Sequence, residues 1–376
     1  MLIRAQVLTI AQIAHVRLSD CSHPPSLRYV RSMENRDTRR RFEQWGKNPN
    51  CEANAVSAIL GVSMVSVAER EGLTSTMGQS PFALQRGQRF ERQLFRSDAE
   101  LLRSELEKAQ VLPNGSQGFA DFRMRLHGGS CANLNDARER TLELFSELAK
   151  EGVTNKTPTI VAGATICVPG RAMLPEAILV LDAIVLKRQE NHAEIVVGEI
   201  KTYPDRGGYT DGVELATARA QSGVYVHGLH EVIEENRWRT IEVSKTGFLV
   251  LTKPGSNQPS IRAREDLHYQ SVRAKRGLEK LRALAGQMVQ SESALKDPVG
   301  AVLAADVNYE ESCVRFCDRA AGCFARAVKS GNPAILGDDV ARLAGTISLD
   351  RVRELLHGAK PQTQAERELV NLAGVA

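Results

Sequence analysis

The chain contains two apolar runs, Ala177-Ile-Leu-Val-Leu-Asp-Ala-Ile-Val-Leu186 and Ala193-Glu-Ile-Val-Val-Gly-Glu-Ile-Lys201. Both are rich in aliphatic and β-branched residues, which is the composition of buried strands. The polar segment between them, residues 187–192, is short enough to be a turn, so the pattern predicts a β-hairpin. We expect this hairpin to bring its two strands together in the core of the fold.

Three charged side chains interrupt these apolar runs. Asp182 lies within the first run, and Glu199 and Lys201 lie two positions apart in the second. Alternate residues of a strand point to the same face, so Glu199 and Lys201 share one face and Ile200 points to the other. The hairpin would place Asp182 beside Glu199. A structural ion pair with Lys201 is the simpler interpretation, because an Asp…Glu-x-Lys pattern often occurs by chance.

The same groups would suit the hydrolysis of a phosphodiester. That reaction needs an activated water, neutralisation of charge on the phosphate and a stabilised leaving oxygen, which one or two Mg²⁺ or Mn²⁺ ions can supply. Such hard cations take carboxylate and backbone carbonyl oxygens, and a lysine can hold the scissile phosphate as a point charge. The pattern therefore indicates a metal at Asp182, Glu199 and the Ile200 carbonyl, with Lys201 beside it.

Further elements surround the hairpin. Helical periodicity predicts helices over residues 51–71, 81–109, 136–150, 213–233 and 262–290. Apolar runs predict additional strands over residues 159–168 and 241–252. This order predicts an α/β core flanked by helical arms.

The predicted helix after the hairpin carries Gln221 and Tyr225, which share one face because they are four residues apart. A polar residue at a helix edge with an aromatic residue in the core would give the same pattern. Together, Asp182, Glu199-Ile200-Lys201 and Gln221-Ser-Gly-Val-Tyr225 resemble the successive motifs of RecB-type nucleases in the PD-(D/E)XK superfamily.

This resemblance implies a restriction-endonuclease-like fold, with a mixed central sheet flanked by helices. It implies that Asp182 and Glu199 bind the metal, that Lys201 serves catalysis, and that Gln221 and Tyr225 support the site and the DNA. The substrate implied is single-stranded DNA or DNA ends.

An earlier family motif, Gly-x-x-x-His, carries a histidine that also reaches the metal. The corresponding stretch here is Gly87-Gln-Arg-Phe-Glu91, with Glu91 in the place of the histidine. Glutamate also ligates Mg²⁺, so Glu91 is a candidate metal ligand. An exposed helix carboxylate is the alternative interpretation.

The chain has seven cysteines, and the odd number argues against a disulfide framework. Cys313, Cys317 and Cys323 are clustered, which in a reducing compartment indicates a metal or an iron–sulfur cluster. For a fourth ligand we expect Cys51, just before the first strong helix, with Cys21 as a weaker alternative.

This cysteine pattern is similar to that of iron–sulfur RecB-type nucleases, the CRISPR-associated adaptation nucleases and the AddB subunits. They place one cysteine before the nuclease core and three after it. Here three residues separate Cys313 from Cys317, where the family usually has two. The resemblance implies a 4Fe-4S cluster that joins the two helical arms in a structural role. Zinc is the alternative ligand, although the paired Cys-x-x-Cys knuckles that favour it are absent.

Charge and composition allow a nucleic-acid partner without requiring one. The formal net charge is +4 and the sequence pI is about 8.7. Arg264, Arg273, Lys275 and Arg276 of the predicted basic helix are candidates to line a DNA channel, although a solvated surface helix is the better explanation of them. No apolar run reaches the length of a membrane span, and we expect a cytoplasmic location.

The sequence thus predicts a metal-dependent deoxyribonuclease, acting in DNA repair, recombination or defence, and able to work with other subunits of such a complex. The alternative is a DNA-binding or scaffold subunit whose nuclease residues are idle. We expect five regions: a basic leader without an assigned role (1–50), an N-terminal arm (51–80), a nuclease core (81–255), a basic helix with the cysteine region (256–330) and a helical tail (331–376).

Overall fold

A computed structural model of the chain describes residues 44–73, 81–168, 177–310, 313–314 and 316–373. Its centre is a seven-stranded sheet. The strands are β1 (Phe119–Asp121), β2 (Ile160–Ala162), β5 (Ala183–Arg188), β6 (Ala193–Pro204), β7 (Ile241–Val243), β8 (Thr246–Thr252) and β9 (Pro259–Asp266). The leader over residues 1–43, including Cys21, lies outside the described residues.

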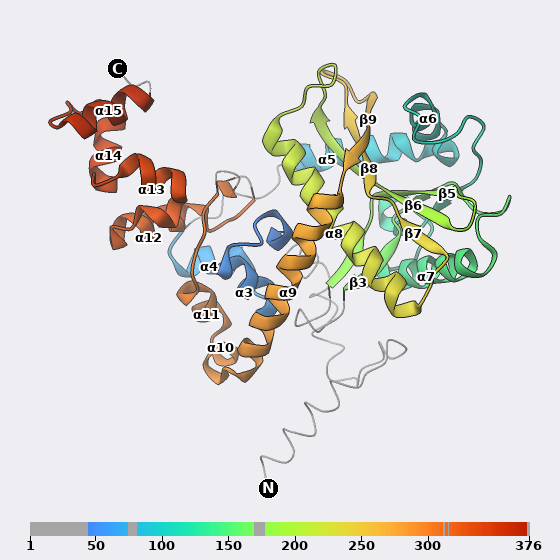
Figure 1. Cartoon of the computed structure of the whole chain (residues 1–376), viewed down its shortest axis with the longest axis horizontal. Helices are drawn as coiled ribbons and strands as arrows, with labels where there is room; N and C mark the ends of the chain where they lie inside the picture. Colours follow the sequence, from blue (N-terminus) through green and yellow to red (C-terminus); the bar gives the residue numbers. More distant parts are fainter. Residues whose placement is uncertain (1–43, 74–80, 169–176, 311–312, 315, 374–376) are drawn as a thin grey trace, which may run out of the picture.

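The sheet is mixed. Its order is β1-β2-β5-β6-β8-β9, with β7 pairing β6 beside β8. The pairs β1–β2, β6–β7 and β6–β8 are parallel, whereas β2–β5, β5–β6 and β8–β9 are antiparallel. The long strand β6 is therefore central and is paired on both sides. The predicted α/β core with a mixed central sheet is confirmed (Figure 1).

The hairpin predicted from the two apolar runs is formed by β5 and β6. Its register runs from Ala183 opposite Gly198 to Arg188 opposite Ala193. The upstream part of the first run is instead β4 (Ala177–Val180), which pairs with β3 (Thr165–Val168) in a separate two-stranded sheet. Asp182 therefore lies at the bend between β4 and β5, not inside a strand as the pattern predicts.

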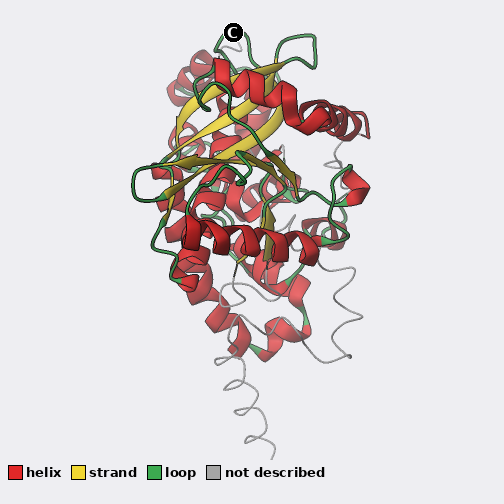
Figure 2. Cartoon of the chain, turned by 90° about the vertical axis from the view of Figure 1, so that its right-hand side faces the viewer, coloured by secondary structure: helices red, strands yellow, loops and turns green. Residues whose placement is uncertain are grey.

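Helices cover both faces of the sheet (Figure 2). One face packs against α5 (Pro81–Leu94) and α6 (Arg96–Lys108), and its strand residues include Val185 and Val196. The other face packs against α7 (Leu134–Glu151) and α8 (Gly212–Asn236), and its strand residues include Ile184 and Val197.

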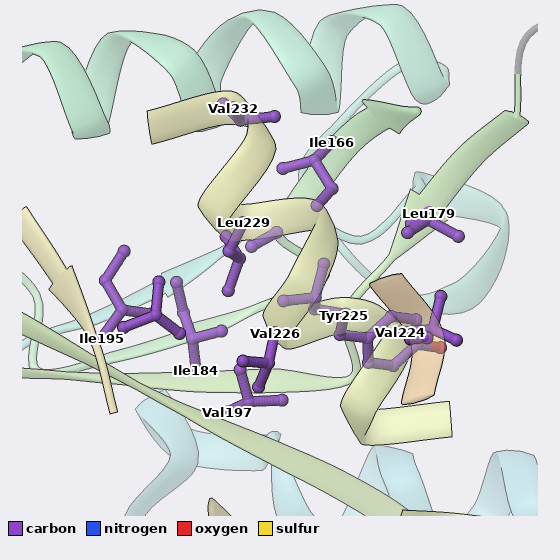
Figure 3. Packing of buried hydrophobic residues seen from close by; sticks show 14 of the residues in the cluster. Ile166, Leu179, Ile184, Ile195, Val197, Val224, Tyr225, Val226, Leu229 and Val232 are labelled. Atoms are coloured by element: carbon purple, nitrogen blue, oxygen red, sulfur yellow. The ribbon is translucent and has the colours of Figure 1, made fainter. Parts of the chain in front are cut away.

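Alternation along β6 explains this division, since neighbouring residues enter opposite cores. On the second face, Val226 of α8 lies against Val197 of β6 (Figure 3).

The arms before and after the core meet each other. The N-terminal arm consists of α3 (Glu52–Leu60) and α4 (Met64–Arg70). These helices pack on α9 (His268–Gln290) and α11 (Pro298–Ala304), and the short α10 (Glu292–Lys296) connects α9 with α11. Glu71 accepts two hydrogen bonds from Arg319, at 2.8 and 2.9 Å, and Arg319 is 2% exposed. The arms are therefore joined by a partly buried ion pair across 248 positions of sequence.

The C-terminal helices lie at the opposite end of the molecule from the sheet (Figure 1). They are α12 (Ala320–Ser330), α13 (Asp338–Ala344), α14 (Leu349–Leu356) and α15 (Gln364–Ala373). A small apolar cluster around Ala327, Leu336 and Leu349 holds the first three together. In the described part of the chain, no helix is long and apolar enough to cross a bilayer.

Several predicted elements are divided in the structure. The helix predicted over 51–71 breaks at Gly61, which adopts φ +73° and closes α3. The helix predicted over 81–109 is interrupted at Ser97, Asp98 and Ala99, which all have positive φ values. The strand predicted over 159–168 becomes β2 and β3 because Gly163, at φ +70°, turns the chain between two sheets.

The prediction of a helix from residue 262 is wrong at its start. Residues Pro259–Asp266 form strand β9, and the helix α9 begins only at His268. Arg264 has φ +58° at a register shift in the β8–β9 pair, a bulge that helical periodicity does not reveal.

Candidate active site

The hairpin brings Asp182, Glu199 and Lys201 together. Ala183 pairs with Gly198, so the residues that follow in the ladder are Asp182 and Glu199. The Ile200 backbone N–H donates to Asp182 Oδ2 at 2.9 Å, which fixes this carboxylate at the edge of β6. The negative charges of Glu199 and Asp182 both stabilise the Lys201 ammonium, so the three side chains interact electrostatically as one group.

Glu199 and Lys201 form an ion pair on the face of β6 that continues from Val197. Glu199 is fully buried, while the Lys201 side chain is 23% exposed. A buried carboxylate is costly unless a cation compensates it, and the ammonium supplies that charge. Burial lowers the pKa of Lys201, but the charges of Glu199 and Asp182 outweigh it, so the pKa lies above its ordinary value. Lys201 is therefore cationic at neutral pH.

Ile200 occupies the opposite face, where its side chain is 6% exposed and packs with Val250 and Phe248. Its N–H is committed to Asp182, which orients the peptide group between the two acids. A ligand role of its carbonyl oxygen stays a prediction.

A cavity of about 190 Å³ opens beside Asp182. It lies between α5 and the turn from β2 to β3, and its walls include Glu91, Arg123, His127 and Gly163. Glu91 and Asp182, far apart in sequence, thus line one cavity. Glu199 and Lys201 are not part of the described lining.

Gln221 and Tyr225 contact each other in α8. The Gln221 side-chain amide donates to the Tyr225 hydroxyl at 2.6 Å. Tyr225 is fully buried in the core between α8 and the sheet, where Figure 3 shows it, and Gln221 lies nearer the surface. The pair thus links the surface of α8 with its core, and any contact with DNA would involve Gln221.

The donor chemistry suits Mg²⁺ or Mn²⁺, because these ions take carboxylate oxygens. In the described residues, however, no three His, Cys, Asp or Glu side chains are gathered closely enough to hold a metal ion. A bound ion would therefore need these side chains in another arrangement. The conformation described is that of the ion-paired site.

The four cysteines predicted as cluster ligands are electrostatically coupled. Burial raises the pKa of the Cys313 thiol, and the charge of Cys51 raises it further. Burial also raises the pKa of Cys317 and raises that of Cys323 to about 11, and both thiols feel Cys51 and Cys313. Cys51, which precedes α3, therefore lies near three cysteines that follow it by more than 260 positions.

Backbone and side-chain donors surround these sulfur atoms. Asn48, which is 1% exposed, donates from Nδ2 to Cys313 Sγ at 3.4 Å, and the Glu310 N–H donates to the same sulfur at 3.3 Å. The Arg319 N–H bonds to Cys317. Each of these bonds would stabilise a thiolate over a thiol, as bound sulfur ligands require.

The four basic residues proposed for DNA do not share one surface. Arg264 belongs to β9 and is exposed, whereas Arg273, Lys275 and Arg276 belong to α9. On a helix, Lys275 lies about 200° from Arg273. Arg273 also lines a small hollow with Trp45. A single channel formed by all four side chains does not follow from this arrangement.

Sequence reasoning missed Asp121, Arg123, His127 and Asn48. The first three belong to the segment around β1, a three-residue strand too short to show periodicity. The spacing Asp121-Phe-Arg123 is the one signal available, since residues two apart on a strand share a face.

Comparisons with known proteins give no relative. No family model matches the chain, and neither the curated proteins nor the solved structures yield a match.

Proposed function

We propose that this protein is a metal-dependent deoxyribonuclease with a restriction-endonuclease-like core. One observation supports the proposal above the others: Asp182, Glu199 and Lys201 form a single charged unit on the hairpin, next to a cavity that Glu91 also lines. The resemblance of the motifs to RecB-type nucleases points to DNA, as single strands or ends. Repair, recombination or defence would use such an activity.

The roles follow from the charges. A bound Mg²⁺ or Mn²⁺ would supply an activated water and neutralise charge at the phosphate, held by Asp182, Glu199 and the Ile200 carbonyl, with Glu91 from the cavity wall. Because the pKa of Lys201 is raised, its ammonium acts as a cation that holds the phosphate, not as a base. The ammonium would also neutralise Glu199 while no metal is bound.

Gln221 and Tyr225 would act indirectly, without contacting the scissile phosphate. The hydroxyl of buried Tyr225 accepts the hydrogen bond from the Gln221 amide, which restricts the amide's rotation. A restricted amide loses less conformational entropy when it contacts DNA.

We also propose that Cys51, Cys313, Cys317 and Cys323 hold a 4Fe-4S cluster in a structural role. The coupling of the four thiols and the N–H donors aimed at them support this assignment. A cluster is larger than one ion, so its ligands stand farther apart than those of zinc. Zinc stays the alternative, because four cysteine thiolates can also hold that ion.

The test is degradation of labelled single- and double-stranded DNA with Mg²⁺ or Mn²⁺. Lys201→Ala and Asp182→Ala should lose about two orders of magnitude or more in rate. Lys253→Ala, an exposed lysine after the neighbouring strand β8, should match the wild-type protein. The nuclease proposal is abandoned if the wild-type protein and both site variants degrade DNA equally, or if none does.

A second candidate is a scaffold subunit with idle nuclease residues. The Glu199–Lys201 ion pair favours it, because the ammonium already compensates the buried carboxylate without a metal. Under this alternative the protein binds DNA without metal-dependent cleavage.

A further inference from the structure

Arg123 lines the cavity next to Asp182, and its side chain is held by Asp121 and Phe95. Its side chain is 10% exposed. Nε and Nη2 donate to the two carboxylate oxygens of Asp121 at 2.9 and 2.7 Å. The guanidinium also lies over the ring of Phe95, 4.4 Å from its centroid. These contacts leave the guanidinium little rotational freedom.

The backbone of Arg123 is held as firmly. A Cβ built on Gly163 would come within 2.7 Å of the Arg123 backbone nitrogen, and one built on Gly129 would meet its carbonyl oxygen. Only glycine permits so close an approach at either position. Gly163 also has φ +70° and lines the same cavity. The local fold therefore fixes the guanidinium before any ligand arrives.

One nitrogen of this guanidinium is not used. Nη1 of Arg123 is buried and has no hydrogen-bond partner among the residues that the structure describes. A buried donor without an acceptor destabilises the folded state, because its hydrogen bond to water is lost and not replaced. Such a cost at a pre-oriented arginine beside a cavity indicates a missing acceptor.

The cavity's charges identify the chemistry of that acceptor. A phosphodiester carries a negative charge and would be repelled by Glu91 and Asp182. Arg123 is the only arginine or lysine among the described residues of the lining. Guanidinium groups match the geometry of phosphate oxygens, and the third nitrogen remains available after Asp121 has taken the other two.

We propose that Arg123 binds a phosphate of the DNA backbone in this cavity and positions the strand against Asp182. This inference rests on the proposed nuclease function, because it assumes that the cavity admits DNA. Nη1 is buried in the described conformation, so the cavity wall around it would have to open for it to donate to a non-bridging phosphate oxygen, while Asp121 holds the other two nitrogens. Arg123 is thus a substrate-binding residue outside the Asp182–Glu199–Lys201 unit.

The test measures binding without cleavage. The fluorescence anisotropy of a labelled single-stranded oligonucleotide is followed in EDTA over a range of salt, and inorganic phosphate serves as competitor. Arg123→Gln should bind about tenfold to hundredfold more weakly, and the slope of log affinity against log salt should fall by about 0.7. Phosphate should compete less well against this variant.

Three variants separate binding from folding. Arg123→Lys keeps the charge and loses the planar fork, so it should recover part of the salt slope but not the full affinity. Asp121→Asn breaks the same ion pair and leaves the guanidinium, so a merely structural role of Arg123 predicts equal losses in both variants. Arg125→Gln changes an exposed arginine of the same segment and should bind as the wild-type protein does. Thermal unfolding shows which variants are folded.

The outcomes distinguish this inference from the proposed function. Arg123 variants that are folded and bind with unchanged affinity and salt slope overturn the inference, even if the wild-type protein degrades DNA. Arg123-dependent binding without any metal-dependent cleavage supports the inference and overturns the nuclease. A wild-type protein that binds neither probe overturns the inference, and the cleavage assay with Mg²⁺ or Mn²⁺ then decides the nuclease separately.

Discussion

The ion pair between Lys201 and Glu199 allows the sharpest test of the described site. Lys201→Met removes the ammonium and leaves a carboxylate that is fully buried. Breaking a buried pair on one side costs about 3–5 kcal/mol. Because the Lys201 side chain is 23% exposed, we expect the lower end, about 3 kcal/mol of unfolding free energy.

The double variant Lys201→Met/Glu199→Gln is the matched control. It removes both charges at similar volume, so most of the lost stability should return. In the single variant, Glu199 should become protonated in the folded state. Its pKa would then be raised, so the destabilisation should be present at neutral pH and should shrink as pH falls toward the pKa of the unfolded chain, about 4.3.

The assay is urea unfolding followed by circular dichroism, with and without Mg²⁺. If a cation can replace the ammonium at Glu199, Mg²⁺ at a hundred times its dissociation constant should restore about 2.7 kcal/mol to Lys201→Met. Mg²⁺ should not stabilise the double variant to this extent. An unfolding midpoint of Lys201→Met equal to that of the wild-type protein would refute the burial of this charge pair.

Three further predictions concern other parts of the chain. Cys51→Ser should lose bound iron, sulfide and brown colour, whereas Cys167→Ser, outside the proposed ligands, should keep them. The iron content of the two purified variants is measured, and equal contents would count against the cluster. Gly198→Ala should lower the unfolding free energy by about 1–3 kcal/mol, because its Cβ would meet the aromatic ring of Phe248 on the facing strand β8. Gly87→Ala, with open space around it in α5, should raise the unfolding free energy by about 0.5–1 kcal/mol. Denaturant unfolding compares the two variants, and equal effects would contradict the described contact. Burial lowers the pKa of His227, so the unfolding free energy should fall as pH drops below about 6.5. His227→Gln should make the unfolding free energy less dependent on pH in this range. If the unfolding free energies of the variant and the wild-type protein change in parallel with pH, another group causes the effect.

The hairpin shows how far local pattern reaches. Two apolar runs and a short polar turn were enough to predict the β5–β6 hairpin and the approach of Asp182 to Glu199, because strand alternation and turn length are encoded by neighbouring residues. They did not show that the first run is divided between β4 and β5. The same reasoning placed Glu199 and Lys201 on one face. It failed at residues 262–266, the end of β9, which were predicted as helix, because a partner strand stabilises an extended segment whatever its own periodicity.

The cavity shows what local pattern cannot reach. Glu91, Arg123 and Asp182 come from three elements that are adjacent only when α5 and β1 have packed on the sheet. The unused nitrogen of Arg123 depends on what Asp121 and Phe95 already occupy, which no single segment encodes.

By itself, the sequence determined the elements whose signals are short in range: an α/β order, the central hairpin and the charged residues that it carries. The tertiary structure alone decided the strand order, the ion-paired state of Glu199, the approach of Cys51 to the three later cysteines, and the cavity at Asp182. The physical reason is that periodicity and turn chemistry act between neighbours, whereas burial and charge compensation depend on which distant segments exclude water from the same place.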